Sequence, residues 1–433
     1  MGKITLNNGN HVYLSGYNVL INKEMEETLC KYGGERKVAI VEGKVDTGRI
    51  KNKISKVRQI IFQTTANCNL RCKYCVYGGA YKNEMVLNKK RMTLDIAIKS
   101  MDYLSDFFKG RNQTELAIGF YGGESLIEFE LIKNIVAYSK KIYKGKNLKY
   151  VLTTNMTLIT TEIIDFLIDN NFALTVSLDG PKVNHDSKRV FENGKGSFDM
   201  VMSGLEQVRV KDLDYYKKNV SIAIVYSRDL SFLKMYDFFN NNEIVNDIAI
   251  SLSPVSKYDT TYYKEYPFDE VKLQEETEIL KSILCEKINK GIELSYIEKS
   301  IMRPINALRK NLSLKSVRTF ANTCMFDDRL FIDTEGNFHV CEKINEKFPF
   351  GNYKDGFDFN KMEKLVRGFE ELNKTVCMDC EIKSLCVRCF VNFAGDGEFK
   401  IPKNFCEDKK REIKKNLESL IAFSKLKEQE NDN

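Results

Sequence analysis

Ten of the twelve cysteines fall into two groups whose spacing suits metal chemistry. The first group is Cys68, Cys72 and Cys75, in the stretch CNLRCKYC. A structural zinc site takes four protein ligands, commonly from paired C-x2-4-C knuckles. Thiolates are also the ligands of iron–sulfur clusters, and a four-iron cluster with only three of them keeps one iron open. The C-x3-C-x2-C spacing, with no fourth cysteine or histidine close by, favours such a cluster over a zinc ion.

The second group lies in the C-terminal quarter of the chain. It consists of Cys324, Cys341, Cys377, Cys380, Cys386, Cys389 and Cys406. By itself the stretch CMDCEIKSLCVRC, residues 377–389, resembles zinc knuckles, so a zinc-stabilised tail is the alternative to iron–sulfur clusters here. The remaining cysteines, Cys30 and Cys285, stand alone and are expected to be small buried apolar residues.

Composition restricts the setting of this chemistry. The N-terminus lacks the apolar core of a signal peptide, and no apolar run reaches the length of a membrane span. A cytoplasmic protein is therefore expected, in which clustered thiols indicate metal ligands and not disulfides. The net charge of +7, from 67 basic and 60 acidic residues, comes without a basic–aromatic stripe that would predict nucleic-acid binding.

A strand–helix alternation surrounds the first cysteine group. Six β-rich stretches are predicted to be strands: residues 57–65, 115–124, 148–155, 172–181, 219–227 and 247–254. Amphipathic helical patterns, such as residues 93–108, separate most of them. This alternation predicts an α/β protein with a parallel sheet, an open partial (βα)6 barrel. The first cysteines follow the first strand, at the end where βα barrels build their active sites.

The next strand ends carry residues suited to hold a ligand. The stretch YGGE places Gly122, Gly123 and Glu124 after the second strand. Glycines let a ligand approach the backbone closely, and Glu124 can fix the strand end. Asn155 ends the third strand, and the fourth ends in SLDGP with Ser177.

These residues resemble the radical S-adenosylmethionine (SAM) family, whose signature is C-x3-C-x-aromatic-C with Tyr74 in the aromatic position. The resemblance implies a [4Fe-4S] cluster on the three cysteines, and abstraction of hydrogen from an unactivated C–H bond. It implies that the GGE turn receives the amino group of SAM. It also implies that Ser177 and Arg189 bind SAM with Asn155 and Ala223 nearby; capping of turns is the alternative for Asn155, Ser177 and Arg189. His185 is expected to be a loop residue and not a catalyst.

The C-terminal cysteines resemble the SPASM extension of radical SAM enzymes, which carries two auxiliary clusters. The resemblance assigns Cys377, Cys380, Cys386 and Cys406 to one cluster, and Cys324, Cys341 and Cys389 to the other. Two clusters bound fully by protein would need eight ligands, so an open iron is expected in the second, unless Asp327 or Asp328 substitutes. Together with the SAM-binding cluster, three [4Fe-4S] clusters are expected.

The most specific resemblance, over roughly residues 55–410, is to maturases of clostridial Cys-rich peptides. It rests on CNLRCKYCVYGGAY, IGFYGGESLIEF, LDGPKVNHDSKRVFENGKGSFD and CEKINEKFPFGN. It implies a ribosomally made precursor peptide with a leader, cross-linked through cysteine thioethers, and an electron donor such as flavodoxin or ferredoxin. Glu342 stands where sulfatase maturases have an aspartate that acts as a base. It is expected to accept a proton or to form a surface ion pair.

The chain is divided accordingly. Residues 1–52 are predicted to be a β-rich element that binds a leader peptide or caps the barrel, and residues 53–255 the radical SAM barrel. Residues 256–320 form a helical bridge, residues 321–410 the SPASM domain, and residues 411–433 a helix and tail. Two alternative functions stay open: an anaerobic sulfatase maturase that makes formylglycine, and an iron–sulfur or zinc-binding protein without catalysis.

Overall fold

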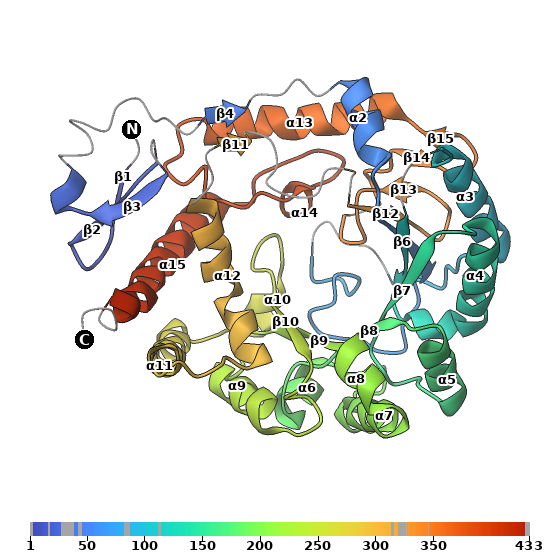
Figure 1. Ribbon diagram of the computed structural model, residues 1–433, viewed down its shortest axis with the longest axis horizontal. Helices are drawn as coiled ribbons and strands as arrows, with labels where there is room; N and C mark the ends of the chain where they lie inside the picture. Colours follow the sequence, from blue (N-terminus) through green and yellow to red (C-terminus); the bar gives the residue numbers. More distant parts are fainter. Residues whose placement is uncertain are drawn as a thin grey trace.

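The central feature of the computed structural model is an eight-stranded sheet of order β10-β9-β8-β7-β6-β5-β12-β13 (Figure 1). The structure describes residues 3–15, 18–26, 39–41, 46–81, 87–110, 114–312, 316–318, 326, 328–344 and 346–428. Six strands in chain order pair in parallel with their neighbours. They are β5 (Gln59–Thr65), β6 (Glu115–Gly122), β7 (Asn147–Thr154), β8 (Ala173–Ser177), β9 (Val220–Tyr226) and β10 (Ala249–Pro254). All six predicted strands and the parallel α/β architecture are confirmed.

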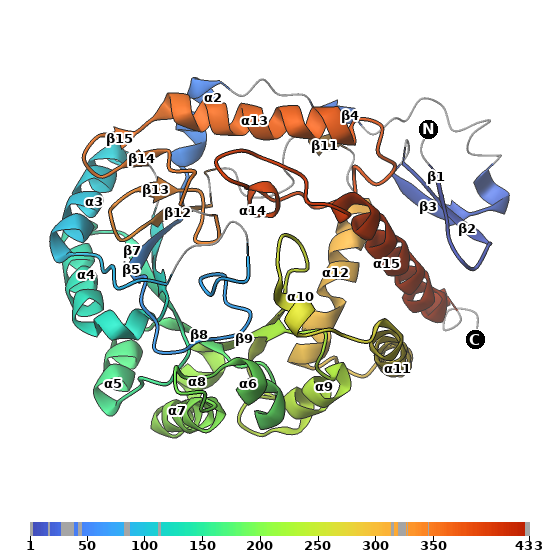
Figure 2. The same cartoon turned by 180° about the vertical axis from the view of Figure 1, so that it is seen from behind.

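Helices cover the outer face of the curved sheet, as both views of the ribbon show (Figures 1 and 2). Those that connect the parallel strands are α3 (Leu94–Phe107), α4 (Phe129–Ile142), α5 (Thr161–Asp169), α6 (Lys182–Lys188), α7 (Phe198–Lys211), α8 (Leu213–Asn219) and α9 (Phe232–Asn241). A short 3-10 turn, η1 (Ser125–Glu128), precedes α4. The predicted helix over residues 93–108 is α3, which begins at its N-cap Thr93.

The two faces of the sheet differ in side-chain character. In β9, Ile222 and Ile224 are buried in the main hydrophobic core, whereas Ser221, Ala223 and Val225 are only partly buried. Successive strand residues point to opposite faces, so the small residues line the inner face of the partial barrel. The inner face can therefore accept a ligand near the strand ends while the outer face holds the fold together.

The sheet is wider than the six predicted strands. Strand β12 (Arg329–Ile332) pairs in parallel with β5, and β13 (Phe338–His339) pairs antiparallel with β12. Both come from the segment predicted to form the SPASM domain. They are short, and a four-residue apolar stretch gives little periodicity to recognise. Pairing with β12 covers the backbone edge of β5, which is otherwise open to other chains.

The remaining elements follow the barrel or precede it. They are α10 (Tyr262–Glu265), α11 (Glu270–Asn289), α12 (Tyr296–Leu312), α13 (Phe359–Cys377), α14 (Phe390–Phe393), α15 (Phe405–Glu428), α2 (Thr47–Ile54), and strands β4 (Ala39–Val41), β11 (Ser316–Arg318), β14 (Gly351–Asn352) and β15 (Gly356–Phe357). Among the described residues, none of these helices combines the length and apolar composition that crossing a membrane requires.

A separate antiparallel sheet lies at the N-terminus, formed by β1 (Lys3–Thr5), β2 (His11–Leu14) and β3 (Val19–Asn22). It is attached to C-terminal parts of the chain. The Tyr13 hydroxyl lies 2.6 Å from the Ser384 hydroxyl, and the Asn18 amide donates to the Asn311 carbonyl at 2.8 Å. The predicted β-rich element is thus present, packed beside α15 (Figure 1). Its role in leader binding stays a prediction.

Candidate active site

The loop after β5 carries Cys68, Cys72 and Cys75, all partly exposed. The backbone fixes this loop against the segment that follows α6: the Arg71 N–H donates to the Val190 carbonyl at 2.7 Å. Burial raises the pKa of the Cys68 thiol to about 11. It raises that of Cys72 to about 12, against the lowering effect of the Arg189 guanidinium. The structure therefore presents three thiols on one ordered loop at the carboxyl edge of the sheet, as predicted.

Gly122 and Gly123 pack directly against the cysteine loop. A Cβ on Gly122 would lie 2.2 Å from the Thr65 carbonyl oxygen, and one on Gly123 2.1 Å from that of Asn67. The Gly123 N–H donates to the Thr65 carbonyl at 3.0 Å. Gly122 also has a φ of +153°, a conformation that favours glycine. The two glycines therefore allow β6 to hold the loop that carries Cys68.

Glu124 is 1 % exposed and accepts three hydrogen bonds. The donors are the Leu126 N–H at 3.0 Å, the Thr154 hydroxyl at 2.8 Å and the Asn155 N–H at 2.6 Å. Burial raises the pKa of this carboxyl group, and the three donors oppose the rise. Glu124 thus joins the ends of β6 and β7, the strand-fixing role expected from the sequence.

Asn155 connects the end of β7 to the cysteine loop. Its side-chain amide donates to the Asn69 side chain at 2.9 Å and points to the Cys68 sulfur at 3.9 Å. Thr157 accepts from Asn69 at 2.8 Å. The structure therefore places Asn155 beside the first thiol group.

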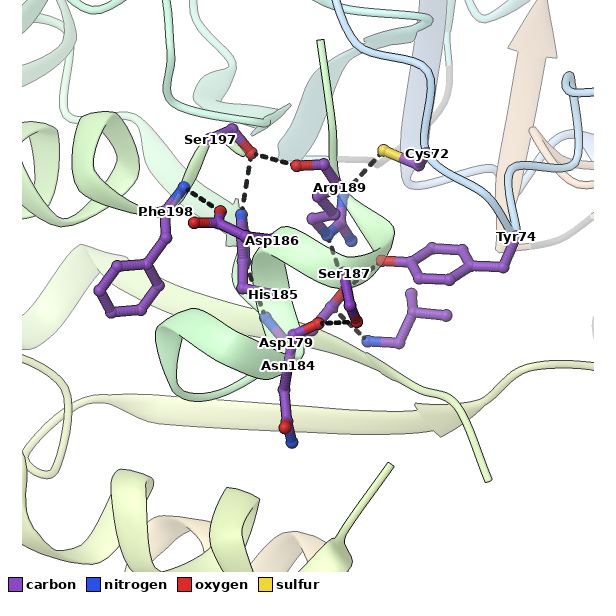
Figure 3. A network of polar contacts seen from close by, with 11 residues as sticks. Cys72, Tyr74, Asp179, Asn184, His185, Asp186, Ser187, Arg189, Ser197 and Phe198 are labelled. Atoms are coloured by element: carbon purple, nitrogen blue, oxygen red, sulfur yellow. Dashed lines mark hydrogen bonds and ion pairs between the residues drawn. The ribbon is translucent and has the colours of Figure 1, made fainter. Parts of the chain in front are cut away.

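Asp179 lies at the centre of a buried polar network (Figure 3). It accepts hydrogen bonds from the Tyr74 hydroxyl, from the Arg189 Nε at 2.9 Å and from the Val225 N–H at 2.9 Å. Arg189 also directs a second nitrogen to the Cys72 sulfur at 3.8 Å. Burial by itself lowers the pKa of Arg189. The neighbouring Asp179 carboxylate opposes this effect, and the resulting pKa lies well above its ordinary value. Asp179 thus holds both Tyr74 and Arg189 against the cysteine loop.

The expectation that His185 is a loop residue was wrong. It lies on α6 and is 0 % exposed. Its Nδ1 accepts from the Asp179 N–H at 3.3 Å, and its Nε2 lies 3.0 Å from the Ser197 hydroxyl (Figure 3). Burial lowers its pKa to about 4, so the ring is neutral near pH 7. His185 thus helps to fix the turn at Asp179 by accepting the hydrogen bond of its backbone N–H.

Ser177 and Ala223 are neighbours on adjacent strands. They are register partners at the end of β8 and on β9, and both are partly exposed. Each has the inner-face parity of its strand, opposite to the core residues Val176 and Ile222. The structure thus brings these two predicted residues together on the inner face.

Burial is the first cause of the raised pKa values of Cys341, Cys386 and Cys406. Burial raises the pKa of Cys386 to about 12, and the nearby Cys377 and Cys380 raise it further. The same two cysteines contribute to the raised pKa of Cys406, after burial. Cys389 instead contributes to that of Cys341, which burial and Glu342 raise to about 12.

The assignment of these cysteines to two clusters stays a prediction, and Cys324 lies outside the described residues. In the part of the chain that the structure describes, no three His, Cys, Asp or Glu side chains are grouped closely enough to hold one metal ion. Ligands of a four-iron cluster bind different irons and stand farther apart than ligands of one ion.

Glu342 is 7 % exposed and paired with Arg329, whose guanidinium donates to its two oxygens at 3.2 and 3.4 Å. The sequence predicted either a proton acceptor or a surface ion pair at this position. The structure shows an ion pair in which the arginine is partly exposed and the glutamate is buried. Asp328 is also paired, with Arg58 at 3.3 Å and Arg329 at 3.4 Å. Asp327 lies outside the described residues.

Two residues of this region were missed from the sequence. One is Asp179, within the stretch SLDGP; an acid so close to predicted SAM ligands is a signal to ask for its partners. Tyr121 precedes the two glycines and has the inner-face parity of β6. Burial is the first cause that raises the pKa of Tyr121, and Glu342, Cys75 and Cys341 add to the rise.

Comparison with known proteins agrees with this geometry. The radical SAM superfamily matches residues 62–238. The cysteine-type anaerobic sulfatase-maturating enzyme of Clostridium novyi is 29% identical over 195 residues, 44% of this chain and 50% of that enzyme. The radical SAM cyclopropyl synthase TigE of Paramaledivibacter caminithermalis is 25% identical, with 59% of this chain and 54% of TigE covered. The matched region thus spans about half the length of these two relatives.

A solved structure described as native anSMEcpe with bound AdoMet and Kp18Cys peptide shares the fold. Its TM-score is 0.64 at 20% identity, over 87% of this chain and 99% of that one. The match extends well beyond residues 62–238 and so includes the C-terminal part of the chain. Together with the cysteine loop and the GGE turn, these comparisons show that the chain is an enzyme with a radical SAM domain over residues 62–238.

Proposed function

We propose that the enzyme modifies a ribosomally made, Cys-rich peptide and joins a cysteine sulfur to a carbon of another residue. The observation that carries the proposal is the order of the sheet: β12 and β13, which lead to Cys341, extend it beside β5, whose following loop carries the first cysteine group. A peptide bound along the inner face beside β5 and β12 would lie near both groups. Relatives that are sulfatase-maturating enzymes, and a fold neighbour solved with a peptide, support a peptide substrate.

The residues of the first site fit a [4Fe-4S] cluster and SAM. Three thiols on one loop leave one iron of such a cluster open. Ser177 and Ala223, register partners on adjacent strands, offer a polar and a small surface nearby. When bound, the cluster and SAM would supply a carbon radical that abstracts hydrogen from a C–H bond.

The second group fits two further clusters. Four cysteines at positions 377, 380, 386 and 406 would hold one of them, and Cys324, Cys341 and Cys389 the other. Asp328 is a poor fourth ligand for the latter, because its carboxylate is already shared between Arg58 and Arg329. An open iron there would accept a substrate thiolate, the ligand that these clusters prefer.

Thioether formation has requirements that this arrangement meets. Joining sulfur to carbon removes a hydrogen atom from the carbon, a proton from the thiol and one further electron. Cys341 and Cys389 would hold the cluster that binds the substrate thiolate, and that cluster would take the electron. Glu342 is held in an ion pair with Arg329, and the thiol proton would pass to solvent.

Formylglycine formation is the second candidate. The fold match to anSMEcpe, over 99% of that chain, favours it. It needs a base beside the cysteine of the G-x4-C element, and Glu342 occupies that position. In this case Glu342 would have to leave its ion pair with Arg329 to accept a proton.

One experiment separates the two. The anaerobically reconstituted enzyme, SAM and a reductant are incubated with a Cys-rich peptide encoded beside its gene, and with a sulfatase peptide carrying a target cysteine. A thioether is expected as the loss of two hydrogens and of one alkylatable thiol from the first peptide. An aldehyde on the second peptide alone would establish formylglycine chemistry instead.

A further inference from the structure

Arg189 makes a contact that the SAM-binding role predicted for it does not explain. Its Nη1 points to the sulfur of Cys72 at 3.8 Å, while its Nε is held by Asp179 at 2.9 Å (Figure 3). The side chain is 9 % exposed and that of Asp179 is 1 % exposed. The N–H groups of Leu70 and Asn155 that point to the Cys68 sulfur are uncharged. Arg189 is thus a buried, charged donor on one ligand.

A donor of this kind affects how readily a cluster is reduced. Hydrogen bonds to the sulfurs and local charge are among the factors that set the potential of an iron–sulfur cluster. Reduction adds one negative charge, and a buried cation stabilises that charge more strongly than an exposed one does. Because Arg189 keeps its proton at any accessible pH, its effect is permanent.

Asp179 makes the contact directional. A guanidinium is planar and rigid, so fixing Nε fixes the direction of Nη1. Asp179 is in turn held by the Val225 N–H and the Tyr74 hydroxyl, and Tyr74 belongs to the cysteine loop. The loop, the strand end and the arginine therefore move as one unit.

We propose that Arg189 raises the reduction potential of the cluster on the first cysteine loop by donating a hydrogen bond to the Cys72 thiolate. One electron from a low-potential one-electron donor enters the cluster, and no proton moves. The inference rests on the radical SAM assignment and is independent of which peptide is modified. Binding of the SAM carboxylate, the role predicted for Arg189, is a separate property with a separate readout.

The test is a reductive titration of the full-length, reconstituted protein without SAM, followed by electron paramagnetic resonance. The signal of this cluster is identified by its change when SAM is added at the end. In Arg189→Gln, the ratio of reduced to oxidised cluster at the wild-type midpoint is expected to fall about tenfold, which is a shift of about 59 mV for one electron. Cluster loss does not spoil the measurement, because the midpoint reports only assembled clusters.

Arg71→Gln is the matched control, because it removes the same charge from the cysteine loop. Arg71 donates to the backbone carbonyls of Cys68 and Leu70, not to a thiol, and its side chain is 39% exposed. At the wild-type midpoint, the ratio of reduced to oxidised cluster in Arg71→Gln is expected to stay within about twofold of the wild-type ratio, because solvent screens exposed charges.

Arg189→Lys separates charge from direction. A lysine keeps the charge but cannot bond to Asp179 and Cys72 as a planar fork. Its midpoint is expected to move in the same direction as that of Arg189→Gln. A wild-type midpoint in Arg189→Lys would refute the directed hydrogen bond. An Arg189→Gln midpoint equal to that of Arg71→Gln, together with weaker SAM binding, would leave Arg189 as a SAM ligand only and overturn the proposal.

Discussion

The backbone at Gly123 touches the backbone at Asn67, one residue before the first cysteine ligand. A Cβ on Gly123 would lie 2.1 Å from the Asn67 carbonyl oxygen and 3.0 Å from the Cys68 Cβ. Neither neighbour is the end of a flexible side chain that can turn away. The position of Cys68 therefore depends on the absence of a side chain at residue 123.

Replacing Gly123 by alanine is expected to displace the cysteine loop. A shift of about 1 Å in a catalytic geometry can cost on the order of 100-fold in rate. We expect Gly123→Ala to lower SAM cleavage by that order, measured as 5′-deoxyadenosine released under reducing conditions. Gly368→Ala on α13 is the control, because among the described residues only the Phe399 ring lies within 4 Å of a Cβ there, at 3.8 Å. Equal activity of both variants would contradict the close contact.

Replacing Glu124 by glutamine tests the connection between β6 and β7. The Leu126 N–H, the Thr154 hydroxyl and the Asn155 N–H all donate to this carboxylate, so an amide NH2 in its place faces a donor. A buried unsatisfied group costs about 1–3 kcal/mol. We expect Glu124→Gln to lower the free energy of unfolding by about that amount in urea titrations. Glu130→Gln on the surface, where the side chain is 76% exposed, should change it by less than about 0.5 kcal/mol.

The sequence predicted the barrel because its strands are long and alternate with amphipathic helices. It did not predict β12, where RLFI is too short to show a period. Gly122, Gly123 and Glu124 could be recognised as site residues from the sequence, because a glycine pair directly after a strand allows a close approach to the backbone. The role of Asp179 was not, because its partners Tyr74 and Val225 are 105 and 46 residues away in the chain.

The stability of the fold is expected to depend on pH through His185. Burial lowers its pKa from 6.5 to about 4, so between these values the unfolded chain binds a proton that the folded chain does not. Stability is therefore complete above pH 6.5 and falls as the pH drops toward 4, by at most about 3 kcal/mol. His185→Asn keeps an acceptor for the Asp179 N–H and has no titrating ring.

The measurement is the free energy of unfolding at pH 7 and pH 5 for both proteins. The difference between wild type and His185→Asn should shrink at pH 5, because only the wild type loses the contribution of a neutral imidazole. Since other groups titrate identically in both, the comparison isolates residue 185. A difference that stays constant between the two pH values would show that His185 titrates normally in the fold.

The division of the C-terminal cysteines into two sets predicts how variants combine. Cys377 and Cys380 contribute to the raised pKa of Cys386. Cys389 lies only three residues from Cys386 in the chain, but it contributes to the raised pKa of Cys341. If each set holds one four-iron cluster, Cys386→Ala should lose about four irons per chain. Cys380→Ala with Cys386→Ala should lose the same four, because both remove ligands of one cluster. Cys386→Ala with Cys389→Ala should lose about eight.

Iron and acid-labile sulfide per chain, measured after anaerobic reconstitution, give the result. Cys285→Ala is the control, since Cys285 lies on α11, apart from both sets, and should leave the iron content unchanged. A four-iron loss from the Cys386 and Cys389 pair would place both cysteines on one cluster and contradict the division. Stoichiometric zinc in place of the missing iron would instead make this segment a zinc-stabilised tail, and the open-iron site proposed for the substrate thiol would then have no cluster to form on.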